Sequence, residues 1–438
     1  MVDNYYVAGD VATFSEALEA GSGLLPGVEN RDNNEKLFSA HLAIISAAID
    51  SNSLFFTWSC CLDYRSHMKI LYLSKRFYTN KDLLAERYGR VFEFSRGLAA
   101  AGHNVTGCAL DYRRNVPDRE LAVQEAGLQW RSYPLFPGPL RQMRRYLDDL
   151  HSLIRAQQPD VLLSSSDVYH VILGDRLARK HSIAHFVDLY DNYESFGASR
   201  VPGITARYRQ ALRRAAGVSC VSKRLGDYLL AEVGLTGRPE VIINAVDLEL
   251  FQPMDMTACR QQLGLPVAGR VIGLGGAISE HRAASTLFAA HRELLEAGLE
   301  VHLALAGTVD RRTTIPRSDY VHYLGELDYR TMPVFFAALD VGVITNSDNQ
   351  FSRYCFPQKY FELRACERPV VIAATGDVRD YTQGCEQSLF TPGDRSALLT
   401  ALRRQLDAPC LAQVDVPDWT GQGARLASFL EKMQPHGA

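Results

Sequence analysis

Two charged residues three positions apart, Lys359 and Glu362, follow a proline in the most informative segment of the chain. Pro357 suits the first turn of a helix, where unpaired backbone N–H groups form a positive end that can hold phosphate oxygens. Lys359 and Glu362 would then share one face of that helix. A carboxylate in this position can accept hydrogen bonds from ribose hydroxyls. A simple exposed ion pair fits the spacing equally well, so both interpretations stay open.

A glycine pair and an arginine form a second candidate phosphate-binding pattern. Gly275 and Gly276 end the apolar run RVIGLGG, and Arg282 lies in the loop that follows. Backbone N–H groups and a guanidinium so placed could grip a diphosphate together. Structural turn glycines beside a surface arginine would produce the same pattern, so this motif decides little by itself.

Two polar segments in the first half of the chain are candidates for an acceptor or phosphate loop and for catalysis. Glu86, Gly89 and Arg90 directly precede an amphipathic stretch, where a helix start could bind phosphate or an acceptor, or could simply be capped. Asp188 and Asp191 follow an apolar run, where carboxylates could orient an acceptor hydroxyl or act as a base. Turn and N-cap roles explain the two aspartates equally well.

Short apolar runs alternate with amphipathic stretches from residue 68 onward, and this alternation predicts an α/β fold. In the first half, the predicted strands are 69–74, 105–110, 159–165 and 184–190, and the predicted helices are 91–103, 146–157 and 173–181. After a joint at 234–253, the predicted strands are 270–276, 300–307, 321–325, 340–345 and 369–373, and the predicted helices are 285–298, 331–339, 358–365 and 418–433. The pattern predicts two parallel sheets covered by helices, which would form a cleft at the carboxyl ends of their strands.

The length of the chain predicts two domains. A chain of 438 residues, 47% of them hydrophobic, exceeds the roughly 250 to 300 residues at which single cores stop growing. Residues 1–67 show no sustained period, and we expect an extension that is disordered or foreign to the natural product. The predicted domains are then 68–240 and 241–415, and a final helix occupies 416–438.

Charge and cysteine usage restrict the partners and the compartment. Residues 68–235 carry a net charge of +8, against −6 before them and −5 after them. An anionic acceptor or an acidic membrane surface would suit this basic segment, and so would a solvated arginine-rich surface. No Cys or His cluster has metal-ligand spacing, and we expect the nine cysteines, Cys60 and Cys61 included, to be inert apolar residues in a reducing cytoplasm. The apolar stretch 37–62 is interrupted by charge and lacks a basic flank, so we expect a soluble protein.

Six segments, in the expected order, resemble glycosyltransferase family 4 and its GT-B relatives from Met68 to about Met433. They are MKILYLS, LAAAGHNVT, AAGVSCVSKRLGDYL, VIINAVDLELFQP, VHYLGELDYRTMPVFFAALDVGVIT and FPQKYFELRACERPVV. The resemblance implies two Rossmann-like domains facing a central cleft, preceded by the irregular extension, with a nucleotide-sugar donor site in the second domain. It also implies that the final helix, from Trp419, packs back onto the first domain.

The resemblance also implies roles for individual residues. Glu362 would bind the ribose, Arg282 and Lys359 would lie near the diphosphate, and Leu324 and Gly325 would lie near the base. The implied donor site further includes Gly275, Gly276, Tyr354, Phe356 and Pro357, and the implied catalytic residues are Asp188, Asp191 and Arg282.

Several positions depart from the family pattern. Tyr354 stands where many members have the first of two glutamates, the one that touches the donor sugar. Many members have an arginine and a lysine after the glycine-rich strand. Here Ala277 follows the glycine pair, and only Arg282 is equivalent to the lysine. Asp188 stands where many relatives have a histidine, and Ala245 replaces the usual glycine of the joint. We therefore expect the sugar contact and the diphosphate contact to differ from those usual in the family.

Family 4 enzymes are retaining, and the resemblance implies that an acceptor hydroxyl attacks from the face where the nucleoside diphosphate leaves. Helix N-termini and Arg282 would stabilise the departing charge, with no bound cofactor and no metal ion. The co-substrate would be a UDP- or GDP-sugar, and the acceptor a glycan, a lipid-linked molecule or a small molecule in surface-polysaccharide or glycoconjugate synthesis. We expect a cytoplasmic hexosyltransferase with peripheral membrane contact through its basic first domain and no nucleic-acid partner.

Other activities stay open on the sequence alone. Nucleotide-sugar epimerases and phosphorylases also use paired Rossmann-like domains, and donor turnover without an acceptor would identify an epimerase. A non-catalytic nucleotide-binding relative would bind donors without turnover. A dinucleotide oxidoreductase fits less well, because the first strand-to-helix turn lacks a G-x-G-x-x-G signature.

Overall fold

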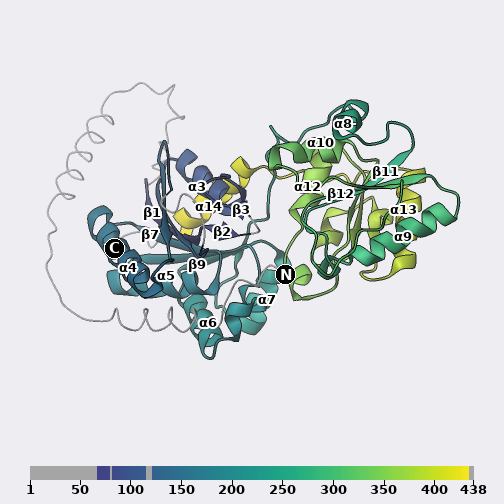
Figure 1. Cartoon of the computed structure of the whole chain (residues 1–438). Helices are drawn as coiled ribbons and strands as arrows, with labels where there is room; N and C mark the ends of the chain where they lie inside the picture. Colours follow the sequence, from purple (N-terminus) through teal and green to yellow (C-terminus); the bar gives the residue numbers. More distant parts are fainter. Residues whose placement is uncertain (1–66, 79–80, 115–120, 434–438) are drawn as a thin grey trace, which may run out of the picture.

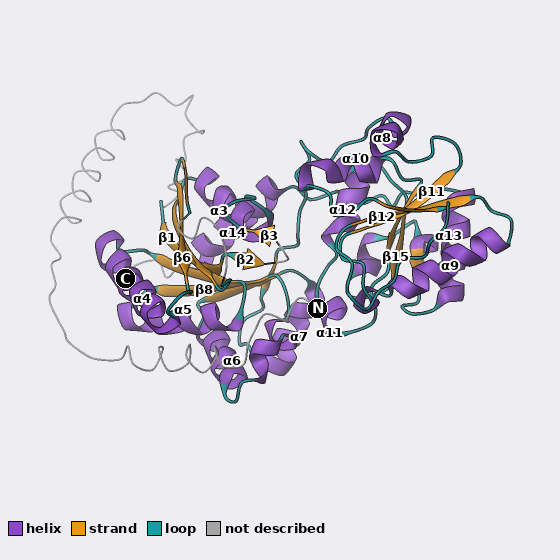
Figure 2. Ribbon diagram, in the orientation of Figure 1, coloured by secondary structure: helices purple, strands orange, loops and turns teal. Residues whose placement is uncertain are grey.

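A computed structural model of the protein describes residues 67–78, 81–114 and 121–433, which form two α/β domains side by side (Figure 1). The N-terminal extension predicted for residues 1–67 lies outside the described residues, apart from His67. In both domains, helices cover the faces of a central sheet (Figure 2).

The first domain has an eight-stranded sheet in the order β10-β9-β8-β7-β1-β4-β6-β5. Neighbouring strands are parallel, except that β5 and β6 form an antiparallel hairpin at one edge. Buried strands such as β1 are apolar along their length because helices cover both faces. The strands are β1 (Lys69–Lys75), β4 (Asn104–Asp111), β5 (Ala122–Glu125), β6 (Leu128–Pro134), β7 (Val161–Ser165), β8 (Ala184–Leu189), β9 (Gly217–Cys220) and β10 (Glu240–Val241). The helices are α3 (Gly89–Ala100), α4 (Pro139–Gln157), α5 (Val168–His181), α6 (Ile204–Arg214) and α7 (Lys223–Tyr228), and a small hairpin of β2 (Phe77–Tyr78) and β3 (Lys81–Asp82) follows β1.

The second domain has a six-stranded parallel sheet in the order β13-β12-β11-β14-β15-β16. The strands are β11 (Arg270–Gly275), β12 (Val301–Ala306), β13 (Val321–Tyr323), β14 (Val341–Ile344), β15 (Val370–Ala373) and β16 (Leu389–Phe390). The helices are α8 (Met256–Leu263), α9 (Ala284–Glu296), α10 (Met332–Ala337), α11 (Gln350–Tyr354), α12 (Gln358–Ala365) and α13 (Arg395–Asp407), and short 3-10 turns include η4 (Glu280–Arg282), η5 (Tyr329–Thr331) and η7 (Glu386–Ser388).

Both sheets contain the strand order of a Rossmann unit, in which the third, second and first strands are followed by the fourth, fifth and sixth. The predicted α/β class with two Rossmann-like domains is therefore confirmed. Within the two large sheets, the strands β5, β6, β9, β10 and β16 were not predicted from the sequence. Four of them are only two to four residues long, and β6 alternates polar and apolar residues instead of forming an apolar run.

The last helix, α14 (Trp419–Met433), lies against α3 of the first domain (Figure 1). Gly97 of α3 faces Gly423 of α14, and a Cβ on either would come within 2.7 Å of the other's Cα. Trp419 belongs to the same buried cluster as the core of the first domain. The chain thus crosses between the domains twice, and the two crossings pair where Val246 N donates to Pro417 O at 3.0 Å.

The two domains also touch away from these crossings. The Tyr88 ring of the first domain meets the Tyr329 ring of the second edge-on, with centroids 4.8 Å apart. At α7, the Asp377 carboxylate of the second domain accepts from Lys223 N at 2.6 Å. An aromatic contact and a hydrogen bond therefore join the two domains at separate places.

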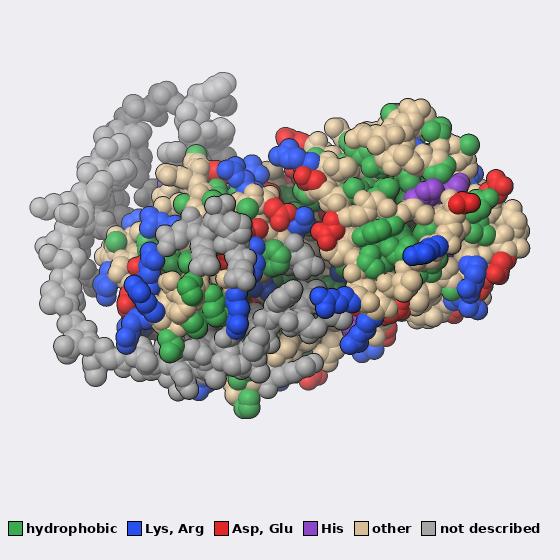
Figure 3. Space-filling model, viewed as in Figure 1, with side chains coloured by type: hydrophobic (Ala, Val, Ile, Leu, Met, Phe, Trp, Pro, Cys, Tyr) green, Lys and Arg blue, Asp and Glu red, His purple; other side chains and the backbone are tan. Residues whose placement is uncertain are grey.

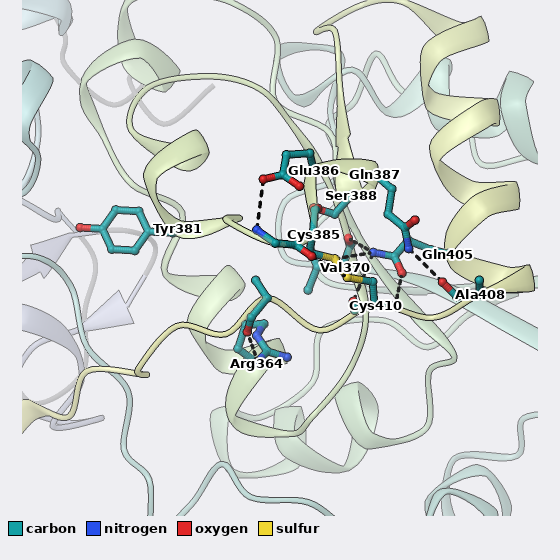
Figure 4. Close-up of a disulfide and its surroundings, with 12 residues drawn as sticks. Arg364, Val370, Tyr381, Cys385, Glu386, Gln387, Ser388, Gln405, Ala408 and Cys410 are labelled. Atoms are coloured by element: carbon teal, nitrogen blue, oxygen red, sulfur yellow. Dashed lines mark hydrogen bonds between the residues drawn. A yellow bond between two sulfur atoms is a disulfide. The ribbon is translucent and has the colours of Figure 1, made fainter.

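Two cysteines that we expected to be inert form a disulfide. Cys385 and Cys410 are bonded, with their Cα atoms 5.8 Å apart, beside the side chain of Gln405 (Figure 4). Gln405 Oε1 also accepts from Cys410 N at 2.8 Å. The bond fastens the segment after α13 to the second domain, and it could not be predicted from the sequence because 25 positions separate the two cysteines.

Among the described residues, no helix has both the length and the apolar character needed to cross a membrane. Across the same residues, no group of three His, Cys, Asp or Glu side chains is arranged to hold a metal ion.

Candidate active site

Glycines at the carboxyl ends of β11 and β12 let neighbouring side chains and backbone approach these strand ends unusually closely. Gly276 has a φ of +104°, and a Cβ there would lie 2.5 Å from Lys359 Cε and 2.8 Å from its Nζ. Gly307, with a φ of +135°, would push a Cβ into the Gly276 carbonyl oxygen. A Cβ on Gly275 would lie 2.9 Å from the Phe336 ring. The predicted glycine pair is thus required by packing, and Gly276 lets the Lys359 side chain lie against the end of β11.

Lys359 and Glu362 lie on α12, which begins directly after Pro357 as the sequence predicted. Glu362 is 5% exposed, and its Oε1 accepts a hydrogen bond from Gln358 Nε2 at 3.0 Å. Burial raises the pKa of Glu362, and the Lys359 charge and the Gln358 hydrogen bond only partly oppose this. No ion pair joins Lys359 to Glu362 in the described part of the chain, so the alternative of a simple helix ion pair is not supported.

Arg282 brings a second cation to the same region. It ends η4, and its carbonyl oxygen accepts from Thr345 Oγ1 at 2.6 Å. The guanidinium carbon lies 5.8 Å from the centre of the Phe351 ring. Burial lowers the pKa of Lys359, and the nearby charge of Arg282 lowers it further. The two partly buried cations therefore repel each other at a place that has no ion-pair partner for either among the described residues.

The charge of Asp191, a residue of the first domain, acts on this cationic region. Burial lowers the pKa of Arg282, while Cys355 and Asp191 act in the opposite direction, which places the Asp191 carboxylate within electrostatic reach of the guanidinium. Asp191 itself is 4% exposed and accepts from Asn192 N at 2.8 Å. Of the two predicted aspartates, Asp191 is the one that the structure brings near the donor-side residues.

Leu324 and Gly325 are joined to the glycine-rich strand ends. Leu324 N donates to Leu305 O at 2.9 Å, and Gly307 N donates to Gly325 O at 2.7 Å. Gly307 in turn abuts Gly276. The turn predicted to lie near the base therefore forms one continuous edge with the glycines beside Lys359.

Arg90 and Asp188 were predicted as site residues, and the structure corrects both assignments. Arg90 Nη2 and Nε donate to the two Asp188 oxygens at 2.7 and 2.9 Å, and Ser219 Oγ donates to Asp188 at 2.7 Å. Both partners of the ion pair are buried, at 3% and 0% exposure. With both oxygens bound, Asp188 is not available as a base, and the pair instead ties the start of α3 to the end of β8.

The remaining residues of the predicted first-domain loop have local contacts. Glu86 is exposed and accepts from Asp82 N at 2.9 Å, with Lys81 Nζ 2.8 Å away. Gly89 begins α3 with a φ of +80°, and a Cβ there would lie 2.5 Å from Tyr78 Oη. The glycine is thus needed for this helix start, whereas the recorded contacts of Glu86 stay within its own loop.

Tyr354 and Phe356 were predicted to contact the donor, and the structure places their side chains elsewhere. The Tyr354 ring lies 4.9 Å from the Tyr228 ring of the first domain, and its carbonyl oxygen accepts from Ser222 Oγ. Tyr354 therefore serves the contact between the domains. Phe356 is 2% exposed and stacks on Phe361, so its ring belongs to the core of the second domain.

Three residues near Glu362 were not predicted to belong to the site. Burial raises the pKa values of Tyr88 and Tyr329, and the negative charge of the Glu362 carboxylate raises them further. Gln358 binds the carboxylate directly. The position of Gln358 four residues before Glu362 was a usable signal, because such pairs meet on one helix face. No sequence signal connects Tyr88 to Tyr329, which lie in different domains.

A surface hollow lies away from these residues, in the second domain. It has a volume of about 640 Å³ and is lined by Ile315, Pro316, Arg317, Ser318, Asp319, Val321 and Tyr323. None of the predicted site residues lines it. The candidate site therefore rests on the chemistry of the residues in the cleft and not on the size of a cavity.

Two family models match successive parts of the chain. Residues 90–250 match Glycosyltransferase Family 4, and residues 269–408 match Glycosyl transferases group 1. Together the two matches span more than half of the chain and divide it at the joint between the two sheets.

Curated relatives are glycosyltransferases as well. A 2-deoxystreptamine glucosyltransferase of Streptomyces kanamyceticus is 28% identical over 227 residues, which cover 49% of this chain and 57% of the relative. A D-inositol 3-phosphate glycosyltransferase of Catenulispora acidiphila is 27% identical over 224 residues, which cover 46% of this chain and 47% of the relative. The chain thus spans about half the length of these relatives.

Solved structures share the fold over most of the chain. Sucrose-phosphate synthase from Thermosynechococcus elongatus matches with a TM-score of 0.68 and 19% identity, over 84% of this chain and 99% of the other. Anabaena HepE in complex with UDP matches with a TM-score of 0.62 and 17% identity, over 83% and 100%. The predicted class of enzyme agrees with every one of these matches. The chain belongs to glycosyltransferase family 4 and has the GT-B fold.

Proposed function

We propose that the protein is a retaining glycosyltransferase that moves a hexose from a UDP-sugar to a hydroxyl group of its acceptor. The observation that carries the proposal is the pair of partly buried cations, Lys359 and Arg282, beside the close glycine turn at Gly276. Burying two cations that have no ion-pair partner in the described part of the chain is costly, and a diphosphate would supply the missing charge. The presence of UDP in the matched HepE structure favours uridine over guanosine.

Each part of the donor has a proposed partner. Lys359, Arg282 and the first turn of α12 would bind the diphosphate, and Glu362 would accept hydrogen bonds from the ribose. The edge at Leu324 and Gly325 would lie along the base. The cations would also stabilise the charge that develops on the leaving nucleoside diphosphate, which is the main catalytic task when no covalent nucleophile is used.

Asp191 is the proposed first-domain participant in the reaction. Its charge acts on the Arg282 guanidinium, so an acceptor hydroxyl bound at Asp191 would lie toward the proposed donor site. A carboxylate there can orient the hydroxyl or accept its proton. Attack from the face that the diphosphate leaves would retain the configuration of the sugar.

The two curated relatives above act, by name, on small cyclitol-type molecules, and we propose a polyhydroxylated acceptor of this kind or the hydroxyl of a glycan or lipid-linked glycoconjugate. We further propose a cytoplasmic protein that contacts an acidic membrane surface through its first domain. Figure 3 shows Lys and Arg side chains along the visible face of that domain, and Arg141, Arg144 and Arg145 of α4 are exposed.

A thermal-shift screen tests the donor site. UDP, GDP, ADP and CMP are added to the wild type, to Glu362→Ala and to the control Glu296→Ala, which removes an exposed carboxylate on α9. A ligand at 100 times its Kd stabilises the native state by about 2.7 kcal/mol. We expect UDP to raise the Tm of the wild type and the control but not of Glu362→Ala.

The same proteins are then incubated with UDP-glucose, with and without polyol acceptors. Transfer to an acceptor supports the proposal. Donor turnover that needs no acceptor would instead indicate an epimerase, and stabilisation without any turnover would indicate a nucleotide-binding relative that is not an enzyme.

A further inference from the structure

The Glu362 carboxylate is held asymmetrically. Oε1 accepts from Gln358 Nε2 at 3.0 Å, whereas no hydrogen bond to Oε2 is recorded among the described residues. Glu362 is 5% exposed, and its Oε2 is not among the fully buried side-chain atoms that lack a hydrogen-bond partner, so this oxygen keeps contact with solvent. Oε2 can therefore accept a hydrogen bond from a ligand.

The described groups around Glu362 do not donate a hydrogen bond to its Oε2. Lys359, its neighbour on α12, lies with its Cε and Nζ against Gly276. Tyr329 of η5 and Tyr88 of the first domain face the carboxylate as neutral phenols whose pKa is raised by burial and by the Glu362 charge. Cys366, one turn further along α12, is a neutral thiol for the same reasons. The amide of Gln358 is thus the one direct hydrogen-bond donor that the described residues give to Glu362.

We propose that Gln358 is a positioning residue, which holds Oε1 of Glu362 so that Oε2 is presented to a hydroxyl of the nucleotide ribose. The inference rests on the proposed donor site. Gln358 is the first residue of α12, and its side chain turns toward the fourth residue along the helix. The backbone N–H of Gln358 lies at the positive end of α12, so one residue would serve the ribose through its side chain and the phosphate through its backbone.

The position of Gln358 has a further chemical consequence. The amide donates to the ionised form of Glu362, and it thereby opposes the rise in pKa that burial causes. Ribose binding by the carboxylate needs that ionised form, because only then are both oxygens acceptors. Removal of the amide should thus weaken binding and also move its pH dependence.

Isothermal titration with UDP and with GDP from pH 5 to pH 9 tests the inference. The variants are Gln358→Leu, Gln358→Ala and the control Gln261→Leu, which replaces an exposed glutamine of α8. We expect both Gln358 variants to bind the nucleotide about tenfold more weakly at neutral pH, the loss of one hydrogen bond to a charged group. We also expect their acid-side loss of binding to begin at higher pH than in the wild type.

The outcomes separate the inference from the proposed function. If the Gln358 variants fold and bind with the wild-type Kd and pH profile, while Glu362→Ala loses binding, Gln358 has no positioning role and the donor site stands. A uniform loss of affinity with an unmoved pH profile would also overturn the inference, because it would indicate only local disturbance of the helix. If neither UDP nor GDP binds the wild type, both the proposed function and the inference fall.

Discussion

Substitution of Gly276 by alanine should damage the candidate site in a way that the structure allows us to work out. The new Cβ would lie 2.5 Å from Lys359 Cε and 2.8 Å from Nζ, far inside van der Waals contact. The backbone cannot retreat, because Gly276 N donates to Ala306 O at 2.7 Å and Gly307 abuts the Gly276 carbonyl oxygen. The flexible end of the Lys359 side chain must therefore move, and the ammonium group would leave the site.

Two separate losses follow from this displacement. An alanine at a φ of +104° is strained by about 1–3 kcal/mol, which should lower the Tm by several degrees. A charged contact to a diphosphate contributes about 1.5–3 kcal/mol, so its loss should weaken UDP binding by roughly 10- to 100-fold. Calorimetric titration with UDP measures the second loss, and a thermal melt without ligand measures the first.

Gly264→Ala is the matched control. Gly264 ends α8 with a φ of +66°, and a Cβ there would meet nothing within 4 Å. This variant should show backbone strain of about 1–2 kcal/mol with the wild-type affinity for UDP. If Gly276→Ala binds UDP as tightly as the control does, Lys359 does not contact the diphosphate and the reasoning from the glycine turn is wrong.

Two further predictions concern pH and the contact between the domains. Burial, with the Asp247 carboxylate nearby, raises the pKa of Glu93 to about 7. The folded protein therefore binds the proton of this carboxyl group more tightly than the unfolded chain does. The free energy of unfolding should fall by up to about 3 kcal/mol as the pH rises from about 4.5 to 7. Denaturant unfolding at several pH values should show that Glu93→Gln removes this decline, and an equal slope in the variant would contradict the assignment. Asp377→Ala deletes the acceptor for Lys223 N, a helix-capping contact that stabilises by about 1 kcal/mol, and should loosen the domains. Hydrogen exchange of α7 should then be faster than in the wild type, whereas unchanged exchange would show that other contacts hold the domains there.

The fold was largely predictable because buried parallel strands must be apolar along their length. β1, β11 and β15 are such runs, and helices with an apolar face separate them. The short strand β16 carries only two residues, too few for any period to be recognised. The disulfide between Cys385 and Cys410 was equally hidden, because their proximity is created by the tertiary fold.

The candidate site was predictable to the extent that it is local in sequence. Lys359 and Glu362 share the helix that begins after Pro357, so spacing alone places the three residues together. Asp188 was misjudged because its partner, Arg90, lies 98 positions away and nothing local announces the pairing. The contact between Tyr354 and Tyr228 was hidden for the same kind of reason, since Tyr228 belongs to the other domain.

Arg90 and Arg282 differ in whether the protein itself neutralises their charge. Burial opposes the charge of Arg90, but the two-fold contact with Asp188 outweighs it and raises the pKa of the guanidinium. Burial also opposes the charge of Arg282, and there the opposing groups are too weak, so its pKa is lowered. A protein that buried Arg282 for stability alone would gain by pairing it as it pairs Arg90. The absence of an ion-pair partner for Arg282 among the described residues is explained if that partner arrives with the substrate. The repulsion between Arg282 and Lys359 then favours binding of a doubly charged diphosphate over a single carboxylate.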